Sequence, residues 1–167
     1  MIIFSYGSNM NLNRITQRVP SAKKITNAYL DGYLLKCIKK NRDGSGKATI
    51  IKTGNIEHRV WGILYNLDEA EKHLLDKAEG LHFGYNETHI EVTAAEGEVY
   101  TTQVYIAAPE AIDENLIPYH WYKAFIVSGA KENNLPASYM NALEKIPSEQ
   151  DPNEERQLMN RSILKGE

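Results

Sequence analysis

The chain has 167 residues, a length that suits one domain burying about two-thirds of the surface that its unfolded chain would expose. Apolar residues make up 42% of the sequence and charged residues 25%, which excludes a chain that is disordered throughout. A formal charge of -3 argues against a dedicated nucleic-acid-binding protein. The single cysteine, Cys37, excludes an internal disulfide, and no apolar run approaches the ~18 residues of a membrane span. We therefore expect a cytoplasmic protein without nucleic-acid or membrane partners.

The first part of the chain predicts short strands separated by turns. Residues 2–4 indicate a buried strand that stops at the turn cluster of residues 7–9, and a short helix follows and ends before Pro20. Asp31-Gly32 is typical of a hairpin or a bulge within a β-rich segment. Strands are predicted within residues 25–38 and at residues 48–51 and 60–65.

The spacing of apolar residues changes to that of a helix after Asp68. This helix can begin at Asn66 or Asp68, and Gly80 ends it. Two strands are predicted at residues 88–93 and 99–107. Two helices are predicted at residues 118–128 and 136–146, and a last helix after the Asp151-Pro152 pair, with Asp151 as its cap. Because strands come first and helices mostly late, the pattern favours an α+β fold around a mixed, barrel-like sheet.

Three sequence patterns that are typical of binding or catalytic sites are incomplete or absent in this chain. Residues 43–48 resemble the end of a phosphate-binding loop, but Asn41 stands where that motif needs glycine and Ala48 where it needs Ser or Thr. The 5 histidines form no pair or cluster with zinc-site spacing. Cys37 lies between polar and apolar neighbours of a strand and is predicted to be a small buried side chain. We therefore expect no metal ion and no cofactor.

Two local features support a functional hypothesis. Tyr6-Gly7-Ser8-Asn9 follows an apolar strand and precedes a helix, so its backbone N–H groups can hold an anion. The simpler alternative is an ordinary turn in which Asn9 or Asn11 caps the helix. Glu79 ends a predicted helix, where the helix dipole disfavours a negative charge. Its carboxyl group therefore either lies in solvent or holds its proton more tightly than usual, as a general base at neutral pH does.

Four segments, taken in their order and spacing, resemble one known family. They are residues 6–10 (YGSNM), 60–65 (VWGILY), 75–80 (LDKAEG) and 129–136 (GAKENNLP). The first three look like the γ-glutamylcyclotransferase family, which is related to AIG2-like proteins. The fourth resembles the cytosolic glutathione-degradation branch, and favours it over the γ-glutamylamine cyclotransferase and antibiotic-biosynthesis branches. The resemblance extends over about residues 2–146.

The resemblance implies a small mixed β-barrel of five or six strands flanked by helices, with the active cleft at its mouth. We place this domain at residues 1–150 and expect residues 151–167 to form a helical tail packed on it. The implied catalytic residue is Glu79, as general acid/base. The implied substrate-binding residues are Ile3, Phe4, Ser5, Tyr6, Gly7, Ser8, Asn9, Tyr85 and Tyr122. The family also suggests a homodimer.

The implied reaction converts an L-γ-glutamyl-amino acid to 5-oxo-L-proline and a free amino acid. The α-amine of the substrate attacks its own γ-amide carbonyl, so the reaction requires no enzyme nucleophile, metal or cofactor. Glu79 would take a proton from this amine and later deliver one to the leaving amine. Two alternatives remain open at this point. The leaving group could be the ε-amine of lysine or another γ-glutamylated amine, or the chain could bind γ-glutamyl metabolites without turnover.

Overall fold

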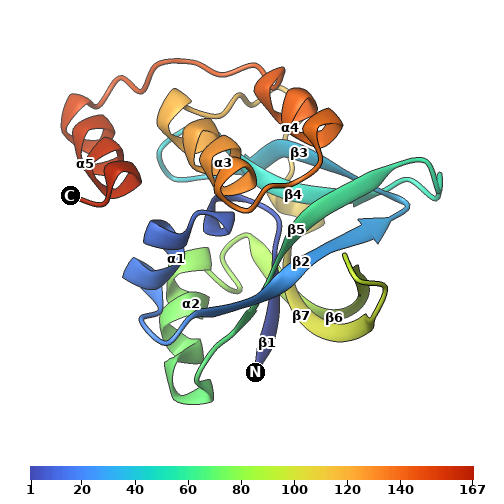
Figure 1. Ribbon diagram of the computed structural model, residues 1–167. Coiled ribbons are helices and arrows are strands. Elements are labelled where there is room, and N and C mark those ends of the chain that lie inside the picture. Colours follow the sequence, from blue (N-terminus) through green and yellow to red (C-terminus); the bar gives the residue numbers. More distant parts are fainter.

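The computed structural model describes residues 1–167, and its centre is a closed barrel of five strands (Figure 1). Around the barrel the order is β1 (Ile2–Ser5), β5 (Arg59–Asn66), β2 (Lys23–Asp31), β6 (Tyr85–Ala94) and β7 (Val99–Ala107). Neighbouring strands run antiparallel except β1 and β7, which meet in parallel at Ile3 and Gln103. The predicted α+β class with a mixed barrel is therefore confirmed, and the number of barrel strands is five.

Two more strands form a separate ribbon, β3 (Tyr33–Lys40) with β4 (Gly46–Lys52). The prediction of a hairpin at Asp31-Gly32 is wrong, because β2 pairs with β5 and β6, whereas β3 pairs with β4. Gly32 has a φ of 81° and turns the chain out of the barrel into the ribbon. A turn sequence determines the local direction of the backbone, but it does not determine which strands pair. Both edges of β2 are occupied by its barrel neighbours β5 and β6, so β3 cannot pair with it.

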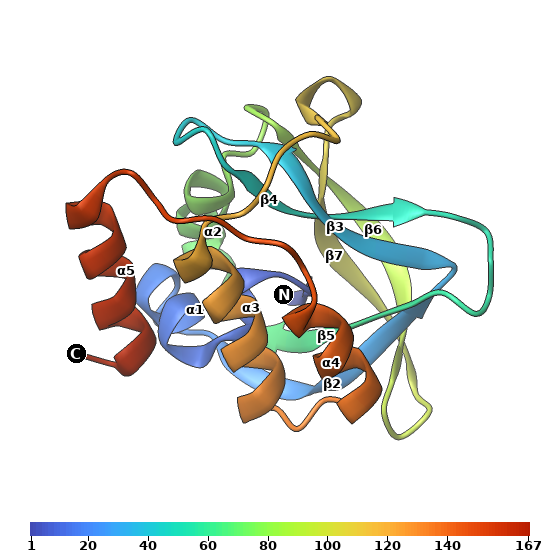
Figure 2. The same cartoon turned by 90° about the horizontal axis from the view of Figure 1, so that it is seen from above.

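Five helices pack around the barrel, and the chain also forms three short 3₁₀ turns, which precede the first three helices. The helices are α1 (Leu12–Arg18), α2 (Lys72–Glu79), α3 (His120–Glu132), α4 (Ala137–Glu144) and α5 (Glu154–Lys165), and the turns are η1 (Ser8–Met10), η2 (Glu69–Glu71) and η3 (Pro109–Ala111). Figure 2 shows α3 and α4 lying close together, with α5 beside α1. None of these helices combines the length and apolar character that a membrane crossing requires.

The ends of the helices follow from their capping residues. The Asn11 side chain accepts a hydrogen bond from the Arg14 N–H at 3.0 Å and starts α1, and Gly80 ends α2 in a left-handed conformation with a φ of 67°. At α5 the cap is Asn153, so the prediction of Asp151 as the cap is wrong. Asp151 is buried instead, and it accepts a hydrogen bond from the Trp121 indole at 2.7 Å.

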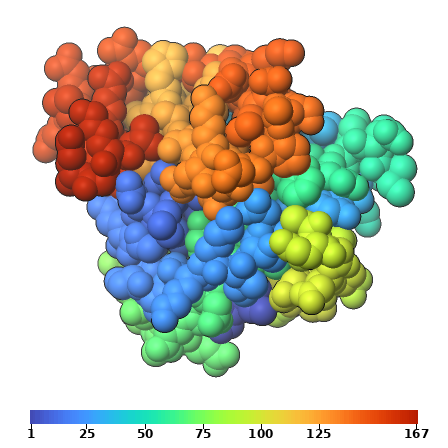
Figure 3. All heavy atoms as spheres, viewed as in Figure 1, coloured from blue at the N-terminus to red at the C-terminus, as the bar shows by residue number.

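The C-terminal residues lie against the helices that precede them. Asp151 also binds the Arg156 guanidinium through both carboxylate oxygens, and Arg14 donates to the Asn160 side chain at 3.1 Å. Helix α5 thereby contacts both α1 and α3. In Figure 3, the orange and red surface of the last third of the chain covers one side of the blue N-terminal segment.

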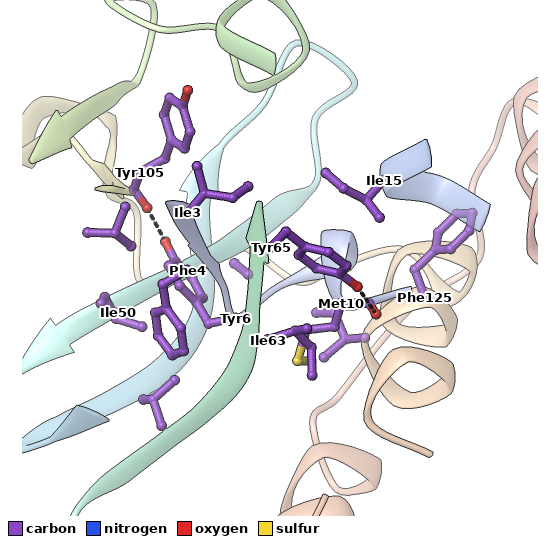
Figure 4. Packing of buried hydrophobic residues seen from close by; sticks show 14 of the residues in the cluster. Ile3, Phe4, Tyr6, Met10, Ile15, Ile50, Ile63, Tyr65, Tyr105 and Phe125 are labelled. Atoms are coloured by element: carbon purple, nitrogen blue, oxygen red, sulfur yellow. Dashed lines mark hydrogen bonds between the residues drawn. The ribbon is translucent and has the colours of Figure 1, made fainter. Parts of the chain in front are cut away.

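Three of the four segments that carry the family resemblance, residues 6–10, 60–65 and 129–136, meet at Met10. The Tyr65 hydroxyl donates to the Met10 carbonyl at 3.0 Å, as Figure 4 shows, and the Asn133 amide donates to the same carbonyl at 3.1 Å. A Cβ atom on Gly129 would lie 2.6 Å from the backbone of Met10, so only glycine permits this approach of α3. Segments distant in the sequence thus hold one turn in place.

Candidate active site

A small cavity of about 40 Å³ lies where β1, the following turn and the end of α2 come together. Its walls include all of the predicted site residues: Glu79, the run from Ile3 through Phe4, Ser5, Tyr6, Gly7 and Ser8 to Asn9, and Tyr85 and Tyr122. The lining also includes Ala48, Leu75 and Tyr105, which the sequence analysis did not identify. The structure therefore brings together residues from β1, β4, α2, β6, β7 and α3 at one point.

Glu79 is held at the cavity by two donors on one of its oxygens. The Asn9 amide donates to Oε1 at 2.8 Å, and the Arg18 guanidinium donates to the same oxygen at 2.8 Å. Arg18 also donates to the Asn9 side-chain oxygen at 2.8 Å, so the three side chains form a closed triangle. The second carboxylate oxygen, Oε2, receives no hydrogen bond from the protein.

This arrangement corrects one of the two expectations for Glu79. The side chain is 16% exposed and paired with Arg18, so it does not lie free in solvent. The Arg18 guanidinium of α1 places a positive charge beside this carboxylate at the C-terminal end of α2, where the helix dipole alone disfavours a negative charge.

The tyrosine hydroxyls of the cavity differ in what they can still donate. The Tyr6 hydroxyl donates to the Tyr105 carbonyl (Figure 4), Tyr85 donates to the Ala48 carbonyl, and Tyr105 donates to the Asp76 carboxylate. The Tyr122 hydroxyl instead accepts a hydrogen bond from the Ala48 N–H at 3.0 Å, so its own proton is directed to no protein acceptor. Tyr122 is therefore the phenol of this cavity with a donor available for a ligand.

Burial keeps these tyrosines neutral. It raises the pKa of Tyr6 and Tyr85 well above the ordinary value, with a further increase from neighbouring groups that include Glu79. Burial is also the main cause that raises the pKa of Tyr122. A neutral phenol donates a hydrogen bond without adding a negative charge beside the Glu79 carboxylate.

The Tyr6–Asn9 turn leads into the 3₁₀ turn η1, and its leading N–H groups have no partner within that turn. A Cβ on Gly7 would lie 3.0 Å from the Ala48 Cβ and 3.6 Å from the Tyr122 hydroxyl, so glycine keeps the space in front of these groups open. The Ser8 hydroxyl accepts a hydrogen bond from Arg14 at 3.1 Å. The turn also contributes Asn9 to the Glu79 triangle, and Asn11, not Asn9, caps the helix.

Comparison with known proteins identifies the family. A family model described as the AIG2-like family matches residues 59–143. The gamma-glutamylcyclotransferase of Homo sapiens is 32% identical over 151 residues, which cover 87% of this chain and 78% of the human protein. The gamma-glutamylcyclotransferase of Mus musculus is 33% identical over 159 residues, which cover 92% of this chain and 80% of the mouse protein. The chain belongs to the γ-glutamylcyclotransferase family.

A solved structure of a gamma-glutamyl cyclotransferase shares the whole fold. It is 29% identical, has a TM-score of 0.85, and the match covers 100% of this chain and 99% of that one. The resemblance predicted from residues 6–10, 60–65, 75–80 and 129–136 is thereby confirmed, and this γ-glutamylcyclotransferase family member is an enzyme of that type. The structure contains no cluster of three or more His, Cys, Asp or Glu side chains suited to a metal ion.

Arg18 is the main site residue that the sequence analysis missed. It occupies the last turn of α1, where a basic residue is common simply because it interacts favourably with the helix dipole. Only the tertiary fold brings it to Glu79. Cys37, by contrast, is buried as predicted, and burial raises the pKa of its thiol to about 12.

Proposed function

We propose that this chain converts L-γ-glutamyl-amino acids to 5-oxo-L-proline and the free amino acid, with Glu79 as the general acid/base. The observation that supports this proposal is the geometry of the Glu79 carboxylate. Asn9 and Arg18 bind Oε1, while Oε2 has no protein partner and the side chain lines the cavity. A carboxylate fixed through one oxygen presents the other in a defined direction, which a proton acceptor requires.

The reaction balances without a further reagent. The substrate α-amine is largely protonated at neutral pH, since its pKa is about 8. Glu79 takes one proton from this ammonium group, and the neutral amine nitrogen forms a bond to the γ-carbonyl carbon. The ring nitrogen of the tetrahedral intermediate passes a second proton to solvent, and the oxyanion collapses as the amide C–N bond breaks. Protonation of the departing nitrogen by Glu79 releases the amino acid and restores the carboxylate. General acid/base catalysis of this kind typically contributes ~10²–10⁴ in rate.

The remaining cavity groups suit the charges of this substrate. The N–H groups of the Tyr6–Asn9 turn and the Tyr122 hydroxyl can donate to the α-carboxylate or to the oxyanion that develops on the γ-carbonyl. Binding of the glutamyl chain in a folded form, with its amine near its own carbonyl, would lower the barrier to ring closure through proximity.

The test is detection of 5-oxoproline by mass spectrometry from γ-glutamyl-alanine and, separately, from Nε-(γ-glutamyl)-lysine. Product from γ-glutamyl-alanine supports the proposal. Product from the lysine derivative alone would assign the chain to γ-glutamylamine cyclotransferase chemistry. Calorimetric binding of γ-glutamyl-alanine without any product would instead indicate a binding module and overturn the proposal.

The proposed setting of the enzyme is the cytoplasm, and its proposed partner is the small γ-glutamyl substrate alone, without a cofactor. The support is the free, buried thiol of Cys37 together with a reaction that moves only protons and one acyl group. A homodimer, which the family resemblance suggests, stays a prediction that light scattering of the purified chain can test.

A further inference from the structure

A second cavity adjoins the one around Glu79 and is lined by several cations. It has a volume of about 150 Å³ and shares Ser8, Glu79, Tyr85 and Tyr122 with the first cavity. Its lining contains four basic side chains, Arg14, Arg18, Lys39 and Lys47. Glu79 is its one acidic side chain, so the lining carries an excess of positive charge.

Two of the four cations already have carboxylate partners. Arg18 pairs with Glu79 at 2.8 Å, and Lys47 pairs with Asp43 at 2.8 Å. Lys39 has neither an ion pair nor a hydrogen bond from its ammonium group, although the residue is only 5% exposed. Its Nζ lies 4.6 Å from the centre of the Tyr85 ring, which is its one close favourable contact.

Arg14 is the second buried cation that forms no ion pair with a carboxylate. It is 7% exposed, and it donates only to neutral groups, the Ser8 hydroxyl at 3.1 Å and the Asn160 side-chain oxygen at 3.1 Å. Its guanidinium stacks over the Phe125 ring at 4.3 Å. Burial is the largest cause that lowers the pKa of Arg14, to about 9, and it also lowers the pKa of Lys39.

A buried charge without a counter-charge destabilises the folded protein, so such groups persist where a ligand completes them. The structure makes room for Lys39 in particular. A Cβ on Gly84 would lie 2.7 Å from the Lys39 Cε and 3.0 Å from its Nζ, so the glycine leaves the path of this side chain open. The two buried cations and the shared wall with the Glu79 cavity indicate an anionic part of the substrate.

We propose that the second cavity binds the carboxylate of the leaving amino acid through Lys39 and Arg14. The inference rests on the proposed function, because it assumes that the glutamyl half occupies the cavity of Glu79. In a γ-glutamyl-α-amino acid the second carboxylate is attached to the carbon next to the scissile nitrogen, so it falls in the adjoining cavity. In Nε-(γ-glutamyl)-lysine it lies several carbons farther away, and in a simple γ-glutamylamine it is absent. Lys39 therefore selects α-amino acids as leaving groups.

The test compares γ-glutamyl-alanine with γ-glutamyl-alaninamide, in which a neutral carboxamide replaces the carboxylate of the leaving group. For the wild-type chain, kcat/KM should be about 10- to 100-fold higher for γ-glutamyl-alanine, the usual worth of a hydrogen-bonded charge pair. Lys39→Met should remove most of this preference, because KM should rise much more for γ-glutamyl-alanine than for the amide. Lys40→Met, a change at the exposed neighbour outside this cavity, is the matched control and should keep the wild-type preference.

The outcomes separate this inference from the proposed function. If wild type cyclises both substrates with equal kcat/KM, or if Lys39→Met slows both equally, the carboxylate site is wrong while the cyclotransferase activity stands. If wild type cyclises neither substrate, the proposed function fails and this inference fails with it. Thermal unfolding gives a further readout that is independent of activity. Removing an unpartnered buried charge should leave the Tm of the free protein unchanged or raise it, whereas a marked fall would show a purely structural role for Lys39.

Discussion

Asn9 and Glu79 lie 70 residues apart in the chain, and the Asn9 amide donates to the Glu79 carboxylate at 2.8 Å. This bond joins the turn after β1 to the last residue of α2, the two segments that provide the candidate site. Arg18 completes the link by donating to both partners at 2.8 Å. The orientation of the proposed base thus depends on a residue of the proposed substrate-binding turn.

Replacing Asn9 by alanine should therefore lower the rate of the reaction. Loss of one hydrogen bond to a charged group is expected to lower kcat/KM by about 10- to 100-fold, because Glu79 loses one of its two donors. Steady-state kinetics on γ-glutamyl-alanine measure this effect. Asn13→Ala, at an exposed position of α1, is the control that should keep full activity, and full activity in Asn9→Ala would contradict the role of the triangle.

Tyr122→Phe should lower turnover because it removes the one cavity phenol whose proton is free for a ligand. The expected loss in kcat/KM is about 10-fold, the typical worth of one neutral hydrogen bond. The control is Tyr119→Phe, since the Tyr119 hydroxyl donates to the Asp43 carbonyl and lies outside the Glu79 cavity. Equal kinetics for the two variants would exclude Tyr122 from substrate binding.

Gly129→Ala should destabilise the protein, although the same change in most helices is favourable. Alanine is ordinarily better than glycine inside a helix by roughly 0.5–1 kcal/mol. Here the new Cβ would lie 2.6 Å from the backbone of Met10 and Asn11, so overpacking should cost about 1–3 kcal/mol. Urea denaturation measures the free energy of unfolding. A stabilised variant would show that α3 does not press against the turn as described.

The ion pair of Asp43 with Lys47 predicts a loss of stability in acid. Burial alone would raise the pKa of Asp43, but hydrogen bonds from Lys47 and the Ser45 N–H outweigh it and lower the pKa to about 2. A folded-state pKa below the unfolded value of about 3.9 means that this carboxylate stabilises the protein above that pH. The contribution should disappear as the pH falls toward about 2.

The check compares wild type with Asp43→Asn by urea unfolding at neutral pH and near pH 2.5. Wild type should be the more stable protein at neutral pH, and the difference should shrink in acid as its carboxylate becomes protonated. A difference that stays constant with pH would show that Asp43 contributes no charge-dependent stability.

The α+β class with a barrel-like sheet could be predicted from the order of strands and helices in the sequence, whereas the candidate site was implied by the resemblance of four segments to the γ-glutamylcyclotransferase family. The apolar strand before Tyr6 and the helix that stops at Gly80 are recognisable from adjacent residues, but the proposed role of Glu79 comes from the resemblance. The pairing of β3 with β4 could not be predicted from Asp31-Gly32, since a turn does not determine which strands become neighbours.

The cations around the site were missed for a related reason. Arg14, Arg18 and Lys39 have the sequence context of ordinary surface residues, and no local pattern marks Arg14 and Lys39 as buried or Arg18 as half-buried. Their burial results from long-range packing, such as the bond between Arg14 and Asn160 at 3.1 Å. The sequence therefore identifies the proposed base, whereas the groups that orient it and those that complement the leaving group emerge from the tertiary structure.

The most direct test of the central claim is the amount of 5-oxoproline that wild type and Glu79→Gln form from γ-glutamyl-alanine. Glutamine keeps the size of the side chain and can still accept a hydrogen bond from Asn9, but it cannot take a proton from the substrate amine. We predict product from wild type and a loss of about 10²–10⁴-fold in the variant, with circular dichroism unchanged. A folded Glu79→Gln protein that forms 5-oxoproline at the wild-type rate would contradict the account.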